Sequence, residues 1–133
     1  MERYDEADPL YRRVLAIRES QLGFDHPDVA VSLNNLAGLY ELTGRYSESE
    51  RLYQRTLAIK ELQLGPEHTS TATSLHNLAV LYDLMGRYSE AEQLYRRALA
   101  IFESQLGSDH PNTVATQNHL TELQEAMGDS SDR

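Results

Sequence analysis

The sequence contains no cysteine among its 133 residues, so it can form neither disulfides nor thiolate metal sites. No apolar run approaches the roughly 20 residues that a membrane-spanning helix needs. The first eight residues are mostly charged, unlike the apolar centre of a signal peptide. We therefore expect a cytoplasmic protein with no membrane partner.

The formal net charge is −9, from 12 basic and 21 acidic residues. Nucleic-acid affinity comes largely from clustered Lys and Arg side chains, so this balance argues against a nucleic-acid partner. The hydrophobic content of 40% and the charged content of 25% are ordinary for a globular protein.

Motifs of the common enzyme classes are missing as well. The chain has no Gly-x-x-x-x-Gly-Lys-Ser/Thr loop, no His-Glu-x-x-His motif, no Gly-x-Ser-x-Gly elbow and no cysteine nucleophile. We predict that the protein is not an enzyme and that it has no cofactor and no metal ion.

One period runs through the whole sequence. The pattern Arg-Tyr-x-Glu-x-Glu/Asp begins at Arg3, Arg45 and Arg87, in steps of 42 residues. Glycines, tyrosines and histidines recur at the same interval. Self-similarity at such a period is the signature of a stacked solenoid, whose function lies on an extended surface.

Each period contains two amphipathic helices. The first helix carries apolar residues at i, i+3, i+4 and i+7, which in the first copy are Leu33, Leu36, Ala37 and Tyr40. Capping side chains and prolines precede these helices, and Gly44 suits a left-handed cap at the helix end. Short turns of this kind make neighbouring helices antiparallel, so we predict an all-α fold.

The predicted elements follow the period and form one domain over residues 1–127. They are a helix at 3–22, helix pairs within 27–64 and 69–106, and a terminal helix at 111–127. The terminal helix has polar residues where the first two copies are apolar, namely Gln117, Thr121 and Gln124. Such a face ends the stacking of a solenoid. Residues 128–133 are expected to be a disordered tail.

Three histidines share the period: His26, His68 and His110. Equivalent residues of successive repeats lie about 10 Å apart, whereas the ligands of one zinc ion lie about 2 Å from it. We interpret each of these histidines as part of a helix-entry turn. By the same reasoning, we expect His76 and His119 to lie apart from one another.

Residues 75–99 carry two motifs most fully, Leu-x-Asn-Leu-Ala-x-Leu-Tyr and Gly-Arg-Tyr-x-Glu-Ala-Glu-x-Leu-Tyr-x-Arg-Ala-Leu. They resemble the tetratricopeptide repeat, and the match covers residues 3–123. The usual repeat has about 34 residues; the longer period here resembles the kinesin light chain subtype. The resemblance implies a right-handed α-solenoid of antiparallel helix pairs, with six helices in the order B-A-B-A-B-A.

Proteins of this family are adaptors that hold a peptide or partner protein along the concave face of their A helices. The resemblance therefore implies a non-enzymatic protein–protein interaction scaffold. The family's ligand-facing positions correspond here to Asn34, Asn35, Gly38, Glu41, His76, Asn77, Val80, Asp83, Asn118, His119, Glu122 and Glu125. Asn35 and Asn77 match the asparagine whose amide holds a peptide main chain, and His119 takes that place in the third copy.

A carboxylate occupies one A-helix position in every copy, at Glu41, Asp83 and Glu125, and no A helix contains Lys or Arg. Stacked repeats would place these three in an acidic ladder. Our hypothesis is a basic or amphipathic partner segment, in contrast to the acidic, aromatic cargo peptides associated with kinesin light chains. The alternative is a solvated face that only aids solubility.

A second interpretation of the sequence is that the protein is a structural or self-association module. The first helix has no A helix before it, so the stripe of Ala7, Leu10, Tyr11 and Val14 lacks a neighbour and favours a homodimer through exposed terminal helices. The same start suggests a fragment of a longer array. The recurring Arg13, Arg55 and Arg97 are interpreted as a solvated outer face.

Overall fold

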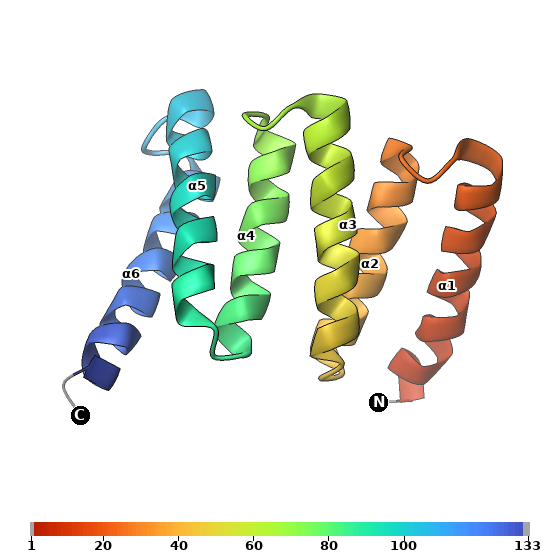
Figure 1. Cartoon of the computed structure of the whole chain (residues 1–133), viewed down its shortest axis with the longest axis horizontal. Helices are drawn as coiled ribbons and strands as arrows, with labels where there is room; N and C mark the ends of the chain where they lie inside the picture. The colour runs from red at the N-terminus through yellow and green to blue at the C-terminus, as the bar shows by residue number, and fades with distance from the viewer. Residues whose placement is uncertain (1, 132–133) are drawn as a thin grey trace. The chain divides into compact units, whose positions relative to one another are not determined.

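The computed structural model describes residues 2–131, which form six α-helices and no strand. They are α1 Glu2–Leu22, α2 Pro27–Leu42, α3 Tyr46–Leu64, α4 Thr69–Leu84, α5 Tyr88–Leu106 and α6 Pro111–Ser131. The predicted all-α fold class is confirmed. The contacts divide the chain into two compact units, Met1–Gly65 with α1 to α3 and Pro66–Arg133 with α4 to α6. Within each unit, successive helices run in opposite directions (Figure 1).

The helix bounds follow the prediction closely except at the end of α6. This helix continues to Ser131, so the predicted end at residue 127 is wrong. Gly128 does not have the positive φ found at the glycines that follow the other helices. A glycine inside a right-handed helix lowers helix stability by about 1 kcal/mol but does not end the helix. Residues 132–133 of the predicted tail lie outside the described residues.

Glycine ends the A helices α2 and α4 as predicted. Gly44 and Gly86 both have φ of +79°, a conformation that side chains with a Cβ rarely adopt. After α2, the amide of Arg45 donates to the carbonyl of Tyr40 at 2.8 Å, which satisfies an acceptor that the helix leaves open. The turn to α3 therefore needs only three residues.

The periodic histidines begin the A helices. Nδ1 of His26, His68 and His110 accepts the amide two residues further on, at 3.0, 3.0 and 3.1 Å. Their interpretation as helix-entry residues is confirmed. The second copy has a threonine in place of the proline that follows the other two histidines, and the imidazole of His68 is still the cap. A neutral ring nitrogen thus satisfies one of the open N–H groups of each helix.

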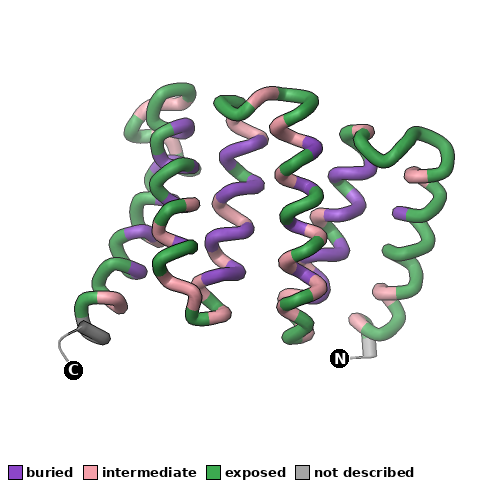
Figure 2. Tube along the Cα trace, in the orientation of Figure 1, coloured by how far each residue is buried: buried purple, intermediate pink, exposed green. Residues whose placement is uncertain are grey.

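The core of residues 1–65 is centred on α2. Figure 2 shows buried residues along α2 and a mostly exposed α1. Leu33 and Ala37 of the predicted stripe are 0% exposed. The hydroxyl of Ser49 on α3 donates to the Ala37 carbonyl at 2.7 Å, so the two backbones approach closely. From α1, only Leu15 is buried among the described residues.

Asp8 joins α1 to the α2–α3 hairpin. Its carboxylate pairs with Arg12 and with Arg45, each at 2.9 Å, and accepts the hydroxyl of Tyr40 at 2.9 Å. Burial raises the pKa of Asp8, but the hydrogen bonds from Tyr40 and Arg45, together with the charges of Arg12 and Arg45, lower it more. Arg55 also has a structural partner, Glu19 of α1 at 2.9 Å, so it is more than a solvated residue.

In residues 66–133, α5 packs against α4 with its buried Ala91, Tyr95, Ala98 and Ile101. The A helix α6 packs against α5 and buries Leu120 and Leu123. The polar residues predicted to face water on α6 are exposed: Gln117, Thr121 and Gln124. The last helix therefore contributes fewer apolar residues than α4 to its unit.

One buried hydroxyl in this unit has no hydrogen-bond partner among the described residues, Oγ1 of Thr113. The equivalent residue 84 positions earlier is Val29, which is fully buried. We expect Thr113→Val to stabilise the protein by about 1 kcal/mol, because an unpaired buried hydroxyl carries a desolvation penalty. Urea unfolding followed by circular dichroism measures this.

Thr116 is the matched control, because it is 1% exposed on the same helix and its hydroxyl donates to the Asn112 carbonyl at 2.9 Å. Thr116→Val should destabilise the protein by about 1–2 kcal/mol. Equal effects of the two substitutions would contradict the role assigned to the unpaired hydroxyl.

Candidate partner-binding surface of the A helices

The predicted ligand-facing residues all lie on α2, α4 and α6, and each is at least partly exposed. Those on α2 belong to residues 1–65, and those on α4 and α6 belong to residues 66–133. The acidic ladder along all three helices includes residues of both units and stays a prediction. Each unit is described in turn.

In residues 1–65, Glu41 of α2 is held by Tyr53 of α3. The Tyr53 hydroxyl hydrogen-bonds to the Glu41 carboxylate. Burial raises the pKa of Glu41, and this hydrogen bond opposes the shift. Gly38 lies beside the pair, since a Cβ there would be 3.8 Å from the Tyr53 hydroxyl. The result is a half-buried carboxylate fixed in one orientation.

In residues 66–133, His76 of α4 and His119 of α6 are in direct contact. Nδ1 of His119 lies 3.1 Å from Nε2 of His76, and the ring centroids are 4.9 Å apart. Our expectation that these histidines lie apart was wrong. The spacing of about 10 Å relates equivalent backbone positions, whereas these residues are 43 apart and not 42. Their two rings extend towards one another from neighbouring A helices.

The hydrogen bonds of this cluster have a defined direction. The Thr116 hydroxyl donates its proton to the Asn112 carbonyl, so it accepts from Nδ1–H of His76 at 2.9 Å. Nε2 of His76 is then an acceptor, and Nδ1–H of His119 is the donor to it. Burial and, to a smaller extent, the charge of His119 lower the pKa of His76 to about 4. His76 is therefore neutral near pH 7.

Tyr95 of α5 completes the cluster. Its ring lies 5.5 Å from that of His76 and 5.9 Å from that of His119. Tyr53 and Tyr95 are two of the tyrosines that recur at the 42-residue interval, and neither they nor Thr116 were among the predicted ligand-facing residues. A buried tyrosine usually needs a partner for its hydroxyl, and this signal was available for Tyr53. For Thr116 the signal was the period itself, because the equivalent residues Ser32 and Ser74 also carry a hydroxyl group.

Asp83 of α4 lies near His119 and Glu122 of α6. Burial raises the pKa of Asp83, the charge of His119 lowers it, and the charge of Glu122 raises it. Within residues 2–131, neither Asp83 nor Glu41 forms an ion pair with Lys or Arg. The A-helix surface of each unit thus has a partly buried carboxylate that forms no ion pair with Lys or Arg.

A small cavity of about 100 Å³ adjoins the histidine cluster and is lined by Thr73, His76, Phe102, Asn112, Ala115 and Thr116. The contact of Thr116 with His76 does not make Thr116 a nucleophile, because Thr116 is buried and its hydroxyl donates its proton to a carbonyl.

No group of three His, Asp or Glu residues suitable for a metal ion occurs in the described part of the chain. Across the same residues, no helix is long and apolar enough to span a membrane.

The model of the tetratricopeptide repeat family matches residues 1–61, 37–104 and 84–132. The chain belongs to the tetratricopeptide repeat family. Proteins of this family are generally interaction modules and not enzymes. No curated protein matches the sequence.

The solved structures place this tetratricopeptide protein among kinesin light chain-like repeats, which confirms the predicted resemblance. The crystal structure of nearly identical TPR-like repeats, assigned to a kinesin light chain of Podosopora anserina, is 32% identical over 97% of this chain, with a TM-score of 0.86. BtubC (BKLC) from P. vanneervenii is 27% identical over 93% of the chain, with a TM-score of 0.82. The chain spans 61% and 49% of these two proteins.

Proposed function

We propose that this tetratricopeptide protein is a scaffold that binds a basic or amphipathic segment of a partner protein on the surface of its A helices. The observation that carries the proposal is that two partly buried carboxylates, Glu41 and Asp83, form no ion pair with Lys or Arg among the described residues. A Lys or Arg side chain of a partner supplies the missing opposite charge. Asn35 and Asn77 are proposed to hold the partner's main chain through their amides.

The electrostatics of both units support this choice of partner. No Lys or Arg occurs in α2, α4 or α6, and the net charge of the chain is −9. At Asp83, the nearby Glu122 adds a second negative charge from α6. An acidic segment would therefore meet like charges, which disfavours its binding.

Titration of labelled peptides by fluorescence anisotropy tests the proposal. We expect an amphipathic Lys/Arg peptide to bind, and a peptide with Glu in place of each basic residue to bind less tightly. The affinity for the basic peptide should fall as the salt concentration rises, because the charges are partly exposed. Asp83→Asn should weaken binding by roughly three- to tenfold, the range of one partly exposed charge pair.

Glu67→Gln is the matched control, because Glu67 is exposed in the turn before α4 and the substitution removes the same charge. It should leave the affinity unchanged. Tighter binding of the acidic peptide, or equal effects of Asp83→Asn and Glu67→Gln, would refute the proposed partner chemistry. Undiminished binding by an Asn35→Ala, Asn77→Ala double variant would remove the main-chain contacts from the proposal.

A second candidate function is self-association, and α1 is the observation that favours it. Leu10, Tyr11, Val14 and Ile17 are 59%, 40%, 43% and 48% exposed. Apolar residues that gather on one helix face in this way often mark a contact with another protein. A homodimer formed through this face of α1 does not use the A helices of residues 66–133, so these helices can still bind a partner protein.

A further inference from the structure

The exposed face of α1 corresponds to a face that is covered in the other two B helices. The residues 42 positions after Tyr11, Val14 and Ile17 are Tyr53, Thr56 and Ile59, all less than 9% exposed on α3. The preceding helix α2 covers these residues of α3. In the same way, α4 covers the residues of α5 that lie a further 42 positions along the chain. The described residues include no helix before α1, so none of them covers this face.

The C-terminal helix α6 of another copy is a poor neighbour for this face. In a head-to-tail stack, α6 would present the residues equivalent to the apolar stripe of α2, which are Gln117, Thr121 and Gln124. These amides and hydroxyls would lose water against the apolar side chains of α1 without new partners. Gln124 already donates to Glu92 within its own unit, at 3.2 Å.

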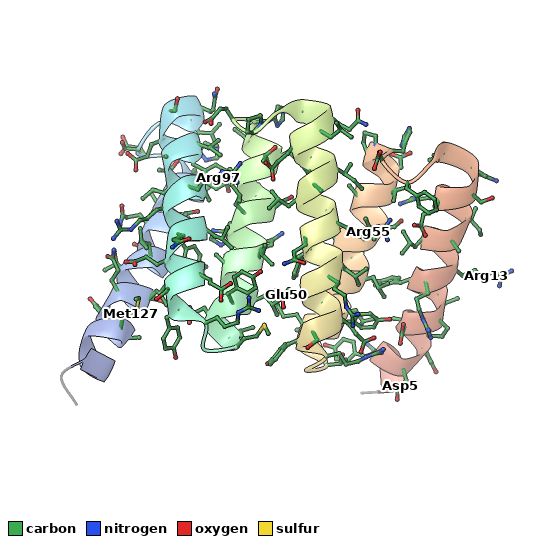
Figure 3. The ribbon with its side chains drawn as sticks, in the orientation of Figure 1. Asp5, Arg13, Glu50, Arg55, Arg97 and Met127 are labelled. Carbon is green, nitrogen blue, oxygen red and sulfur yellow. The ribbon has the colours of Figure 1, made fainter. Side chains whose placement is uncertain are left out.

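Two charges flank the exposed face of α1. Glu6 lies four residues before Leu10 and Arg13 three residues after it, and their spacing of seven residues places both on the same side of the helix. Both are exposed, and neither has a partner among the described residues. Figure 3 shows Arg13 extending from α1 away from α2.

This arrangement is self-complementary about a two-fold axis. When a second α1 packs antiparallel with the axis near Leu10, Glu6 of each copy meets Arg13 of the other, and Leu10 meets its own equivalent. Parallel packing about a two-fold axis would instead put the charged sides of the two helices on opposite sides of the contact, which leaves Glu6 and Arg13 without partners. The charges thus select one orientation, and a two-fold contact of this kind closes at two copies.

We propose that α1 pairs antiparallel with α1 of a second copy of this chain, through Leu10, Val14 and Ile17 and two reciprocal Glu6–Arg13 ion pairs. The proposal rests on the self-association function and specifies its surface. One helix face is smaller than the roughly 800 Å² per partner of a standard interface, so the dimer is weak and concentration-dependent.

Sedimentation equilibrium of the full chain, from micromolar concentration to about 1 mM, measures the dimer. We expect a mass that rises from 15.1 kDa to twice that value. Glu6→Arg and Arg13→Glu should each weaken dimerisation about tenfold or more, because each replaces two attractions by two repulsions. The double variant carries the pairs in reverse and should restore the wild-type dissociation constant within about threefold.

Glu67→Arg is the control for the change in net charge and should leave dimerisation unaltered. Circular dichroism verifies that every variant keeps its helices, which we expect because the changed residues are exposed. A wild-type monomer at all concentrations would remove both self-association and this surface. A dimer that ignores the charge swaps, or a mass that grows beyond two copies, would leave self-association standing and overturn the antiparallel α1 contact.

Discussion

Acidification from about pH 7 to about pH 4.5 should destabilise the unit of residues 66–133 by about 1–2 kcal/mol through His76. Burial and the charge of His119 lower the pKa of His76 from 6.5 in a free side chain to about 4 in the folded protein. The ring is packed against Tyr95 and hydrogen-bonded to Thr116, so a proton on Nε2 would break the contact with His119.

The direction follows from proton binding. Between pH 6.5 and about 4, the unfolded chain carries a proton on His76 that the folded chain does not. Unfolding therefore takes up a proton, and the stability falls as the pH falls through this window. The full pKa shift of His76 corresponds to a loss of about 3 kcal/mol in the free energy of unfolding. Because the ring is partly exposed to solvent, we expect the smaller loss of about 1–2 kcal/mol.

Urea unfolding at a series of pH values, compared between wild type and His76→Asn, isolates the contribution of His76 to the pH dependence of stability. Asn34 and Asn118 occupy the same position in the other two copies, so asparagine suits this site on the helix. The comparison is needed because the raised pKa values of Glu41 and Asp83 act in the opposite direction. His26→Asn is the control, since asparagine is also a good helix cap. An unchanged pH dependence in His76→Asn would exclude the mechanism.

Loss of the Asp8 carboxylate should cost about 2–3 kcal/mol, because Asp8→Ala leaves two arginines and a tyrosine hydroxyl without their shared acceptor. The Asp8 side chain is only 16% exposed, which limits the screening of its charge by water. It is also the residue that connects α1 with Tyr40 of α2 and Arg45 before α3. The helix most affected should be α1, which buries little else.

Hydrogen exchange of the α1 amides, together with urea unfolding, measures this effect. Asp5→Ala is the matched control, because Asp5 is an exposed carboxylate on the same helix, and it should change stability by less than about 0.5 kcal/mol. The folded-state pKa of Asp8 is lowered, so its contribution is present above the unfolded value of 3.8 and is lost as the pH falls through the folded value. Equal protection of α1 in Asp8→Ala and wild type would contradict the role of this residue.

The sequence was a reliable guide wherever the controlling interaction is local. The helix bounds, the glycine caps at Gly44 and Gly86 and the buried stripe of α2 depend on residues a few positions apart, and periodicity reports these directly. Repetition of the pattern at 42 residues made each local inference testable in three copies. The one misplaced helix end, at Gly128, lacks the left-handed backbone that ends the other A helices.

Contacts between helices were not predictable from the same pattern. The pair of His76 and His119 joins residues 43 apart, and Asp8 meets Tyr40 from 32 residues away. Whether two such side chains meet depends on the angle between helices and on the reach of each side chain, neither of which a period specifies. The period even misled here, because it treats only equivalent positions as neighbours.

The amino-acid sequence by itself determined the all-α repeat, its family and the absence of basic residues from the A helices, because these follow from composition and short-range spacing. Only the tertiary structure decided which carboxylates are partly buried without a Lys or Arg partner, which imidazole stays neutral, and which face of α1 is exposed. These properties depend on how much water packing removes from around each group. The packing involves helices that are far apart in the sequence, so short-range spacing does not predict it.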